Sequence, residues 1–293
     1  MRTTTISQKI LALGRSLPEQ DWFDRVGDLT ALRGSEADGF YRSNYDRGPL
    51  LYSLIAARRP TTVLEFGTGR GYGTVCMAKA MVDHKIDGQI FTVDVLAFND
   101  RQTWPINRGF GPAVEMLSAA DVWNRHFETA LLDRINRLTG DSGTLAEEWR
   151  QRDRPKPDFG FIDAGHRYEE VRHDYFTFLS LCSPRPVILF DDYSTRPDFG
   201  VKRLVDTEVA SGFDIELLRT EWRAGDATGN GEKEPEGMAL VESVNDQNGA
   251  PRGPSSDAVE RQLINARRRL RILRAKDQAK SFLRPIARVW RTR

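Results

Sequence analysis

The sequence predicts an α/β protein built on an open, doubly wound and mainly parallel sheet that finishes in an antiparallel hairpin. Apolar β-forming runs alternate with helix-compatible stretches along most of the chain. Such alternation indicates parallel strands joined by right-handed crossovers. Near residue 213 the alternation stops, and two strands follow with no helix between them, so they must pair as antiparallel neighbours. Seven strands are expected in total.

The expected parallel strands carry apolar residues and end at or beside a glycine or an aspartate. They fall at residues 61–67, 89–95, 134–140, 158–164 and 185–191. Helices are expected between them, at residues 72–83, 111–124, 143–151, 167–182 and 199–211. The hairpin strands follow at residues 213–222 and 236–243. A single parallel half followed by a hairpin lacks the second mononucleotide-binding half of a dinucleotide fold.

Changes in composition divide the chain into four regions. Residues 1–58 are mostly helical and form an N-terminal cap, and residues 59–243 form the α/β domain. Residues 244–258 are a linker rich in Gly, Pro, Ser and Asn. Residues 259–293 form a basic, amphipathic helical tail.

The net charge of +1 conceals a split between body and tail. The tail has twelve Lys or Arg and two acidic residues, a net of +10, which leaves −9 for the rest. An acidic body argues against nucleic acid as a partner. The tail is expected to dock on that body or to contact a second subunit of a homo-oligomer, with an anionic membrane surface as the next alternative and nucleic acid as the last.

Apolar residues recur along the tail at helical spacing, at Val259, Leu263, Ala266, Leu270 and Leu273. Asp277 interrupts this stripe, and Pro285 is expected to end the helix. No stretch approaches the roughly 20 apolar residues of a membrane span, and no signal peptide is recognisable. Cys76 and Cys182 are expected to be buried free thiols, so a cytoplasmic setting is predicted, with peripheral membrane attachment through the tail as the alternative.

The stretch VLEFGTGRGYGT, residues 63–74, joins the first strand to a helix. A dinucleotide fingerprint would need a third glycine where Tyr72 or Thr74 stands. Glycines here let the backbone approach a ligand, and an acidic residue before them suits a cationic or amino-acid-like ligand better than a pyrophosphate. The expected cofactor contacts from this turn are Glu65, Gly67, Thr68 and Gly69.

The next two strands end in residues that suit a nucleoside. Asp94 can accept from two ribose hydroxyls, and Asp141, followed by Ser142, can accept from an adenine amine. A nucleoside with a cationic attachment and no phosphate is S-adenosylmethionine. At this point the sequence resembles the class I S-adenosylmethionine-dependent methyltransferases, which are Rossmann-like and whose first motif is E/D-x-G-x-G.

Three aspartates are predicted to meet beside the cofactor turn. Asp163 ends the fourth strand, and Asp191 and Asp192 end the adjacent fifth strand. Clustered carboxylates repel one another unless a cation lies among them, and oxygen ligands favour Mg²⁺ or another hard divalent cation. The alternative is that Asp163 and Asp192 only cap the helices that follow.

The motif I-D-x-x-H-x-Y-E, with D-D-Y starting 28 residues after its aspartate, resembles the metal-dependent O-methyltransferases of the macrocin and aminocoumarin (TylF-like) type. The resemblance covers roughly residues 41–243. It implies that Asp163, Asp191 and Asp192 hold the metal. It also implies a magnesium-assisted methyl transfer to a hydroxyl of a small molecule or sugar, as in a natural product or glycan. A hydroxylase-like or non-catalytic cofactor-binding relative of the same fold is the alternative.

One position departs from this family. Some relatives carry a base carboxylate two residues after the first aspartate, where this chain has Gly165. His166 is the nearest group able to take a hydroxyl proton, so His166 and Asp163 are the predicted catalytic residues. The alternative for His166 is a bond to neighbouring backbone only, and His173 is expected to face solvent.

The connection at residues 97–112 is long, polar and aromatic, and it is expected to form a lid over the acceptor. Trp104 and Phe110 within it could stack on a ring of the acceptor, or pack into the core instead. An amino-group nucleic-acid methyltransferase would have an Asn/Asp-Pro-Pro-aromatic motif after the fourth strand, where residues 163–166 read DAGH.

Overall fold

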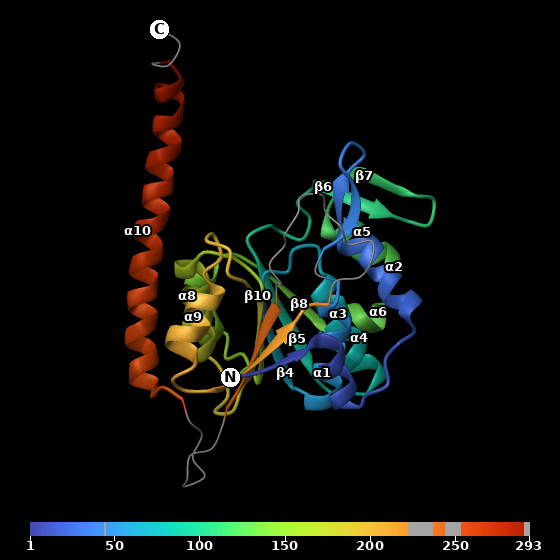
Figure 1. The fold of residues 1–293 in the computed structure, drawn as a ribbon, viewed down its shortest axis with the longest axis horizontal. Helices are drawn as coiled ribbons and strands as arrows, with labels where there is room; N and C mark the ends of the chain where they lie inside the picture. The colour runs from blue at the N-terminus through green and yellow to red at the C-terminus, as the bar shows by residue number, and fades with distance from the viewer. Residues whose placement is uncertain (44, 222–236, 244–252, 290–293) are drawn as a thin grey trace.

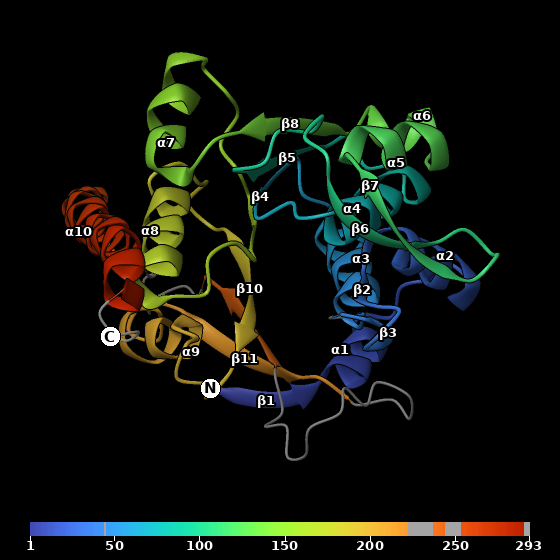
Figure 2. The same ribbon diagram turned by 90° about the horizontal axis from the view of Figure 1, so that it is seen from above.

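The structure is a computed structural model, and it describes residues 1–43, 45–221, 237–243 and 253–289, with side chains as far as residue 279. A central sheet has helices on both faces, so that the molecule has three layers (Figures 1 and 2). This arrangement confirms the predicted doubly wound α/β fold. Residues 244–252 of the expected linker lie outside the described residues.

The sheet has eight strands in the order β1-β11-β12-β10-β9-β4-β5-β8. The parallel strands are β4 (Thr62–Phe66), β5 (Gln89–Asp94), β8 (Ile135–Thr139), β9 (Phe159–Ile162) and β10 (Val187–Tyr193). The predicted hairpin is β11 (Asp214–Arg219) and β12 (Gly237–Glu242), which are antiparallel. The expected total of seven strands is wrong by one, because β1 (Arg2–Thr5) pairs in parallel with β11 at the edge.

Each face of the sheet is covered by its own set of helices. One face carries α1 (Ile6–Leu13), α2 (Gln20–Thr30), α3 (Arg47–Arg58), α4 (Tyr72–Asp83), α5 (Ala119–His126) and α6 (Thr129–Leu132). The other carries α7 (Ser142–Gln151), α8 (Tyr168–Leu179), α9 (Val201–Leu204), the π-helical turn η1 (Val205–Val209) and α10 (Ser256–Val289). The strand order reverses between β4 and β9, and at such a switch point doubly wound sheets bind their ligands.

Helix α3 shows how burial fixes these layers. Leu50, Leu51, Leu54 and Ile55 are completely buried against α4 and the sheet. Each such side chain contributes about 1.5–3 kcal/mol through removal of its apolar surface from water. The burial orients α3 so that its first residue, Arg47, lies at the carboxyl ends of the strands.

Two expectations for the middle of the chain are wrong. Residues 97–112 are not one irregular loop, and residues 111–124 are not one helix, while the lid role of 97–112 stays a prediction. A hairpin of β6 (Gln102–Asn107) and β7 (Pro112–Leu117) occupies much of this region. Exposure alternates along β7, which is the period of a strand, and a capping box of Ser118 and Asp121 starts α5 only afterwards.

A second hairpin, of β2 (Leu32–Ser35) and β3 (Gly39–Arg42), lies in the region expected to be mostly helical. Gly34 and Gly39 both have positive φ, and at Gly34 a Cβ would come within 2.0 Å of the Gly39 carbonyl oxygen. Glycine therefore allows the two strands to close here.

The tail forms a single long helix, α10, that lies along α8 and extends past the body (Figure 1). Its contact face is the predicted stripe, with Val259, Leu263, Ala266 and Leu270 all buried. Pro285 does not end the helix, which continues to Val289. Within the described ranges, no helix is both long and apolar enough to cross a membrane.

Candidate active site

The turn between β4 and α4 touches the loop that follows β9. Gly67 has a φ of +93°, and a Cβ at this position would come within 2.1 Å of the Asp163 carbonyl oxygen. Gly71, also at positive φ, has no room for a Cβ because the Trp123 ring would lie 2.0 Å away. Glycine is therefore required at both positions, and the ends of β4 and β9 form one continuous surface.

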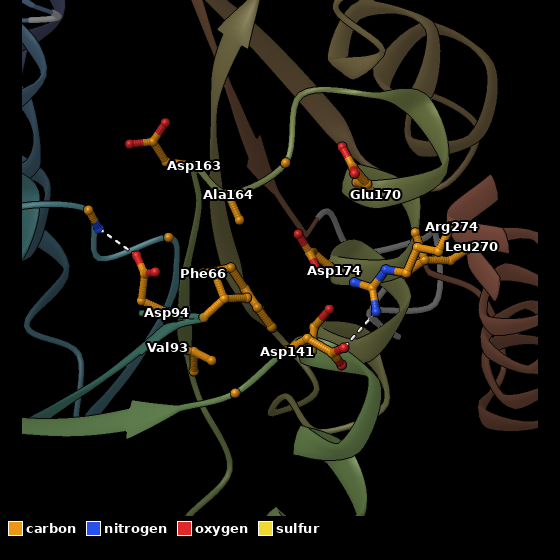
Figure 3. Close-up of a pocket in the computed structure, with 16 residues that line it drawn as sticks. Phe66, Val93, Asp94, Asp141, Asp163, Ala164, Glu170, Asp174, Leu270 and Arg274 are labelled. Carbon is orange, nitrogen blue, oxygen red and sulfur yellow. Dashed lines mark hydrogen bonds and ion pairs between the residues drawn. The ribbon is translucent and has the colours of Figure 1, made fainter. Parts of the chain in front are cut away.

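A cleft of about 440 Å³ opens at this surface (Figure 3). Five of the predicted cofactor residues line it, namely Gly67, Gly69, Asp94, Asp141 and Ser142. The lining also includes Phe66, Val93, Val95, Gly140, Asp163, Ala164, Gly165, Glu170, Asp174, Leu270 and Arg274. Apolar walls with a few convergent carboxylates suit a cationic nucleoside.

Two aspartates of the cleft hold its backbone in shape. Asp94 accepts from the Gly69 amide at 2.8 Å and from the Leu96 amide at 3.0 Å. Asp141 accepts from the Gly143 amide at 2.6 Å and from Arg274 Nη1 at 2.6 Å (Figure 3). Burial alone would raise the pKa of Asp141, but these two donors lower it below its usual value.

Helix α10 forms part of the cleft wall, which the sequence did not suggest. Leu270 and Arg274 line the cavity from α10, opposite the strand end that carries Asp94 (Figure 3). Leu270 belongs to the apolar stripe of the tail, so the stripe was a signal for a buried contact. It gave no indication of which part of the body the helix covers.

Two predicted cofactor residues do not line the cleft. The Glu65 carboxylate accepts from Thr74 Oγ1 at 2.5 Å beneath the turn, where Glu65 is buried. Thr68 forms a hydrogen bond of 2.5 Å with the Thr92 hydroxyl and lines the neighbouring cavity instead. Glu65 therefore supports the turn from beneath and does not line the cleft.

Burial raises the pKa of Glu65 to about 7, despite hydrogen bonds from Thr74 and Thr92 and the charge of Arg47, which lower it. The folded state thus holds a proton between pH 4.5 and about 7 that the unfolded state has lost, so stability falls as pH rises through that window. In wild type the free energy of unfolding should fall by about 3 kcal/mol across this window, and Glu65→Gln, which cannot titrate, should abolish that fall. Urea unfolding of both proteins at pH 5 and pH 8 measures it, and an identical pH dependence would contradict the assignment.

The three predicted metal ligands lie close together, with an arginine between two of them. Arg47 Nη1 donates to Asp191 Oδ2 at 2.7 Å and also binds Asp163 Oδ2. Burial alone would lower the pKa of Arg47, but Asp163 and Asp191 outweigh it and raise the pKa above its usual value. Burial and the two neighbouring carboxylates raise the pKa of Asp163, and Arg47 opposes that rise.

The oxygen donors of this cluster have the chemistry that Mg²⁺ prefers, but their arrangement is not a metal site as it stands. Among the residues that the structure describes, no three His, Cys, Asp or Glu side chains converge so as to hold a metal. Arg47 supplies the positive charge that the cluster requires. Arg47 Nε is buried and has no hydrogen-bond partner among the described residues, so its N–H group is available to donate a hydrogen bond to a ligand.

His166 is bonded to the third aspartate, with 2.7 Å between its Nδ1 and Asp192 Oδ2. This bond raises the pKa of His166, although burial opposes the rise. The ring stacks on Phe199, with 4.8 Å between the ring centroids. Asp192 has a φ of +57°, which is uncommon outside glycine and is found at functional sites that the surrounding fold constrains.

A second cavity, of about 330 Å³, adjoins the cofactor cleft and shares Gly67, Gly69, Asp163 and Ala164 with it. We call it the acceptor cavity. Its other lining residues are Thr30, Arg33, Ser43, Arg47, Thr68, Arg70, Gly71, Tyr72, His166, Asp192, Arg196 and Phe199. Predicted catalytic residues and the cap region thus meet in one cavity.

Three further sequence expectations can be placed. His173 does not face solvent but is fully buried, with its Nδ1 2.8 Å from the Ser142 hydroxyl. Trp104 is also fully buried and donates to the Leu29 carbonyl at 2.8 Å, so it packs in the core rather than on an acceptor. Phe110 is fully exposed at the tip of the β6–β7 hairpin and lines neither cavity. Of the two cysteines, both free, Cys76 is buried and Cys182 is partly exposed.

Part of the chain matches a known protein family. Residues 64–193 match the family model Methyltransf_24, described as a methyltransferase domain. A protein of Sinorhizobium fredii (strain NGR234), described as uncharacterized protein y4gI, is 27% identical over 156 residues. That match covers 53% of this chain and 16% of y4gI, so the chain spans about one sixth of that relative.

Several solved structures share the fold. An O-methyltransferase from Bacillus cereus in complex with S-adenosylhomocysteine has a TM-score of 0.50 at 19% identity, covering 80% of this chain and 96% of that one. TomG, an O-methyltransferase of tomaymycin synthesis in Streptomyces achromogenes, has a TM-score of 0.50 at 18% identity, with coverages of 80% and 95%. A putative O-methyltransferase from Klebsiella pneumoniae has a TM-score of 0.51 at 19% identity, with coverages of 80% and 96%.

Proposed function

We propose that this chain, whose residues 64–193 match a methyltransferase domain, transfers the methyl group of S-adenosylmethionine to a hydroxyl oxygen of a small molecule or sugar. This proposal rests on the fact that two cavities lie side by side. The cofactor cleft and the acceptor cavity meet at Gly67, Gly69, Asp163 and Ala164. A sulfonium in one cavity and a hydroxyl in the other would be in contact, as an in-line transfer requires.

His166 is the base in this proposal. Asp192 holds Nδ1 of the imidazole, which leaves Nε2 to take the proton of the acceptor hydroxyl. The carboxylate of Asp192 would then stabilise the imidazolium that forms. Asp163, between the two cavities, would hold the acceptor end of the site in place through Arg47.

A divalent cation at Asp163, Asp191 and Asp192 stays a prediction. Mg²⁺ bound there would orient and acidify the hydroxyl. To bind, it would have to displace Arg47 from Asp163 and Asp191.

Two measurements test the proposal. Calorimetric titration with S-adenosylhomocysteine is expected to show binding at one site, and Asp94→Ala is expected to weaken it about tenfold or more through loss of ribose contacts. Exposed Asp133→Ala, away from both cavities, is the matched control. Mass spectrometry of hydroxylated acceptors is expected to show a gain of about 14 Da, the mass of a CH₂ group. A gain of about 16 Da would indicate hydroxylation, and no cofactor binding would overturn the proposal.

A further inference from the structure

The acceptor cavity has an excess of positive charge after the ion pairs formed by its lining residues are taken into account. Its lining includes four arginines, at positions 33, 47, 70 and 196. Arg47 is paired with Asp163 and Asp191, and Arg196 is paired with Asp198 at 3.1 Å. His166 and Asp192 pair with each other. Arg33 and Arg70 remain.

Neither Arg33 nor Arg70 forms an ion pair with a carboxylate among the described side chains. Arg70 donates to two backbone carbonyls, Leu32 O at 2.6 Å and Thr103 O at 3.1 Å. Arg33 has only a long contact of 3.5 Å with the Leu32 carbonyl. Both guanidinium groups are half-buried, and half-buried charges are unfavourable unless an opposite charge compensates them.

The two groups are also close enough to influence each other. Burial and, to a smaller extent, the charge of Arg33 together lower the pKa of Arg70 to about 10. Burial and the charge of Arg47 likewise lower the pKa of Arg33, and the influence of Tyr41 and Asp163 does not outweigh them. A fold that holds two unpaired cations side by side in a cavity has the charge arrangement of an anion site.

We infer that the acceptor carries a phosphate group, which Arg33 and Arg70 bind while its hydroxyl lies at His166. This inference rests on the proposed function and names its substrate class. A phosphate bears up to two negative charges and can accept from two guanidinium groups at once, whereas a carboxylate neutralises only one of them. Arg33 belongs to the β2–β3 hairpin of the cap, outside the matched residues 64–193, whereas Arg70 lies within them.

Binding of inorganic phosphate to the full chain, measured by calorimetry at constant ionic strength, tests the inference. Wild-type protein is expected to bind phosphate more tightly than acetate or chloride. Arg33→Gln and Arg70→Gln are each expected to weaken phosphate binding about tenfold or more. The exposed Arg125→Gln, which lines neither cavity, is the matched control and should retain wild-type binding.

Titration with S-adenosylhomocysteine separates this inference from the proposed function. The cofactor cleft contains neither Arg33 nor Arg70, so both variants should bind S-adenosylhomocysteine as wild type does, which also shows that they are folded. Phosphate binding no tighter than acetate binding, or unchanged in both variants, would overturn the inference and leave cofactor binding intact. Absent cofactor binding in wild type would instead overturn the proposed function.

Discussion

We expect His166→Ala to lower kcat by roughly 10²–10⁴-fold, the usual contribution of a positioned general base. The loss should appear in kcat and leave cofactor affinity unchanged, because His166 lines the acceptor cavity and not the cofactor cleft. About half of its side chain is exposed (52%), so truncation should not unfold the protein. Steady-state kinetics measures kcat, and titration with S-adenosylhomocysteine measures the cofactor affinity.

A matched pair of variants distinguishes a base from a structural contact. Asp192→Asn keeps the shape of the partner but removes its charge and no longer fixes the His166 tautomer, so it too should lower kcat, by up to about 10⁴-fold. His126→Ala, in α5 and away from both cavities, should leave kcat unchanged. Full activity of His166→Ala would show that another group takes the hydroxyl proton.

Arg47→Met is expected to produce the largest change in stability. The substitution leaves Asp163 and Asp191 buried without their counter-charge, and breaking a buried pair in this way costs about 3–5 kcal/mol. Arg58→Met, at the other end of α3, is the matched control. Its ion pair with Glu242 is partly exposed, so the loss there should stay below about 1 kcal/mol.

The same variant tests which cation belongs in the carboxylate cluster. Without Arg47, the cluster is expected to bind Mg²⁺, and Mg²⁺ should raise the melting temperature of Arg47→Met by several degrees. Wild type is expected to show a smaller rise, because Mg²⁺ must first displace Arg47 from Asp163 and Asp191. A melting temperature of wild-type protein that rises with Mg²⁺ and falls back with EDTA would show that the metal displaces Arg47.

The fold was predictable from the sequence because the parallel strands are short apolar runs that end at glycine or aspartate. The region between β5 and α5 was not predictable, because apolar and polar residues alternate only weakly in the sequence of β7 and this strand lies outside the main sheet. The edge strand β1 was missed because RTTT has no apolar side chain to mark it. In both cases the pairing partner, rather than the segment itself, determines the structure.

The site was predictable to the extent that it depends on strand ends. The carboxyl ends of β5, β9 and β10 brought Asp94, Asp163 and Asp192 to one edge, as strand order requires. Arg47 could not be found in this way, because it begins a helix of the cap, and its contacts with the cluster depend on how α3 packs. The place of Arg33 in the acceptor cavity was not predictable either, because it depends on how the cap packs on the sheet.

The seating of α10 has a consequence for any shortened version of this protein. Leu270 and Arg274 stand some two hundred residues after the glycine turn, yet they border the same cleft. A fragment cut at the end of the sheet would therefore lose one side of the nucleoside cleft and leave Asp141 without its arginine. The smallest piece able to hold the cofactor properly extends well beyond the region that sequence comparison recognises.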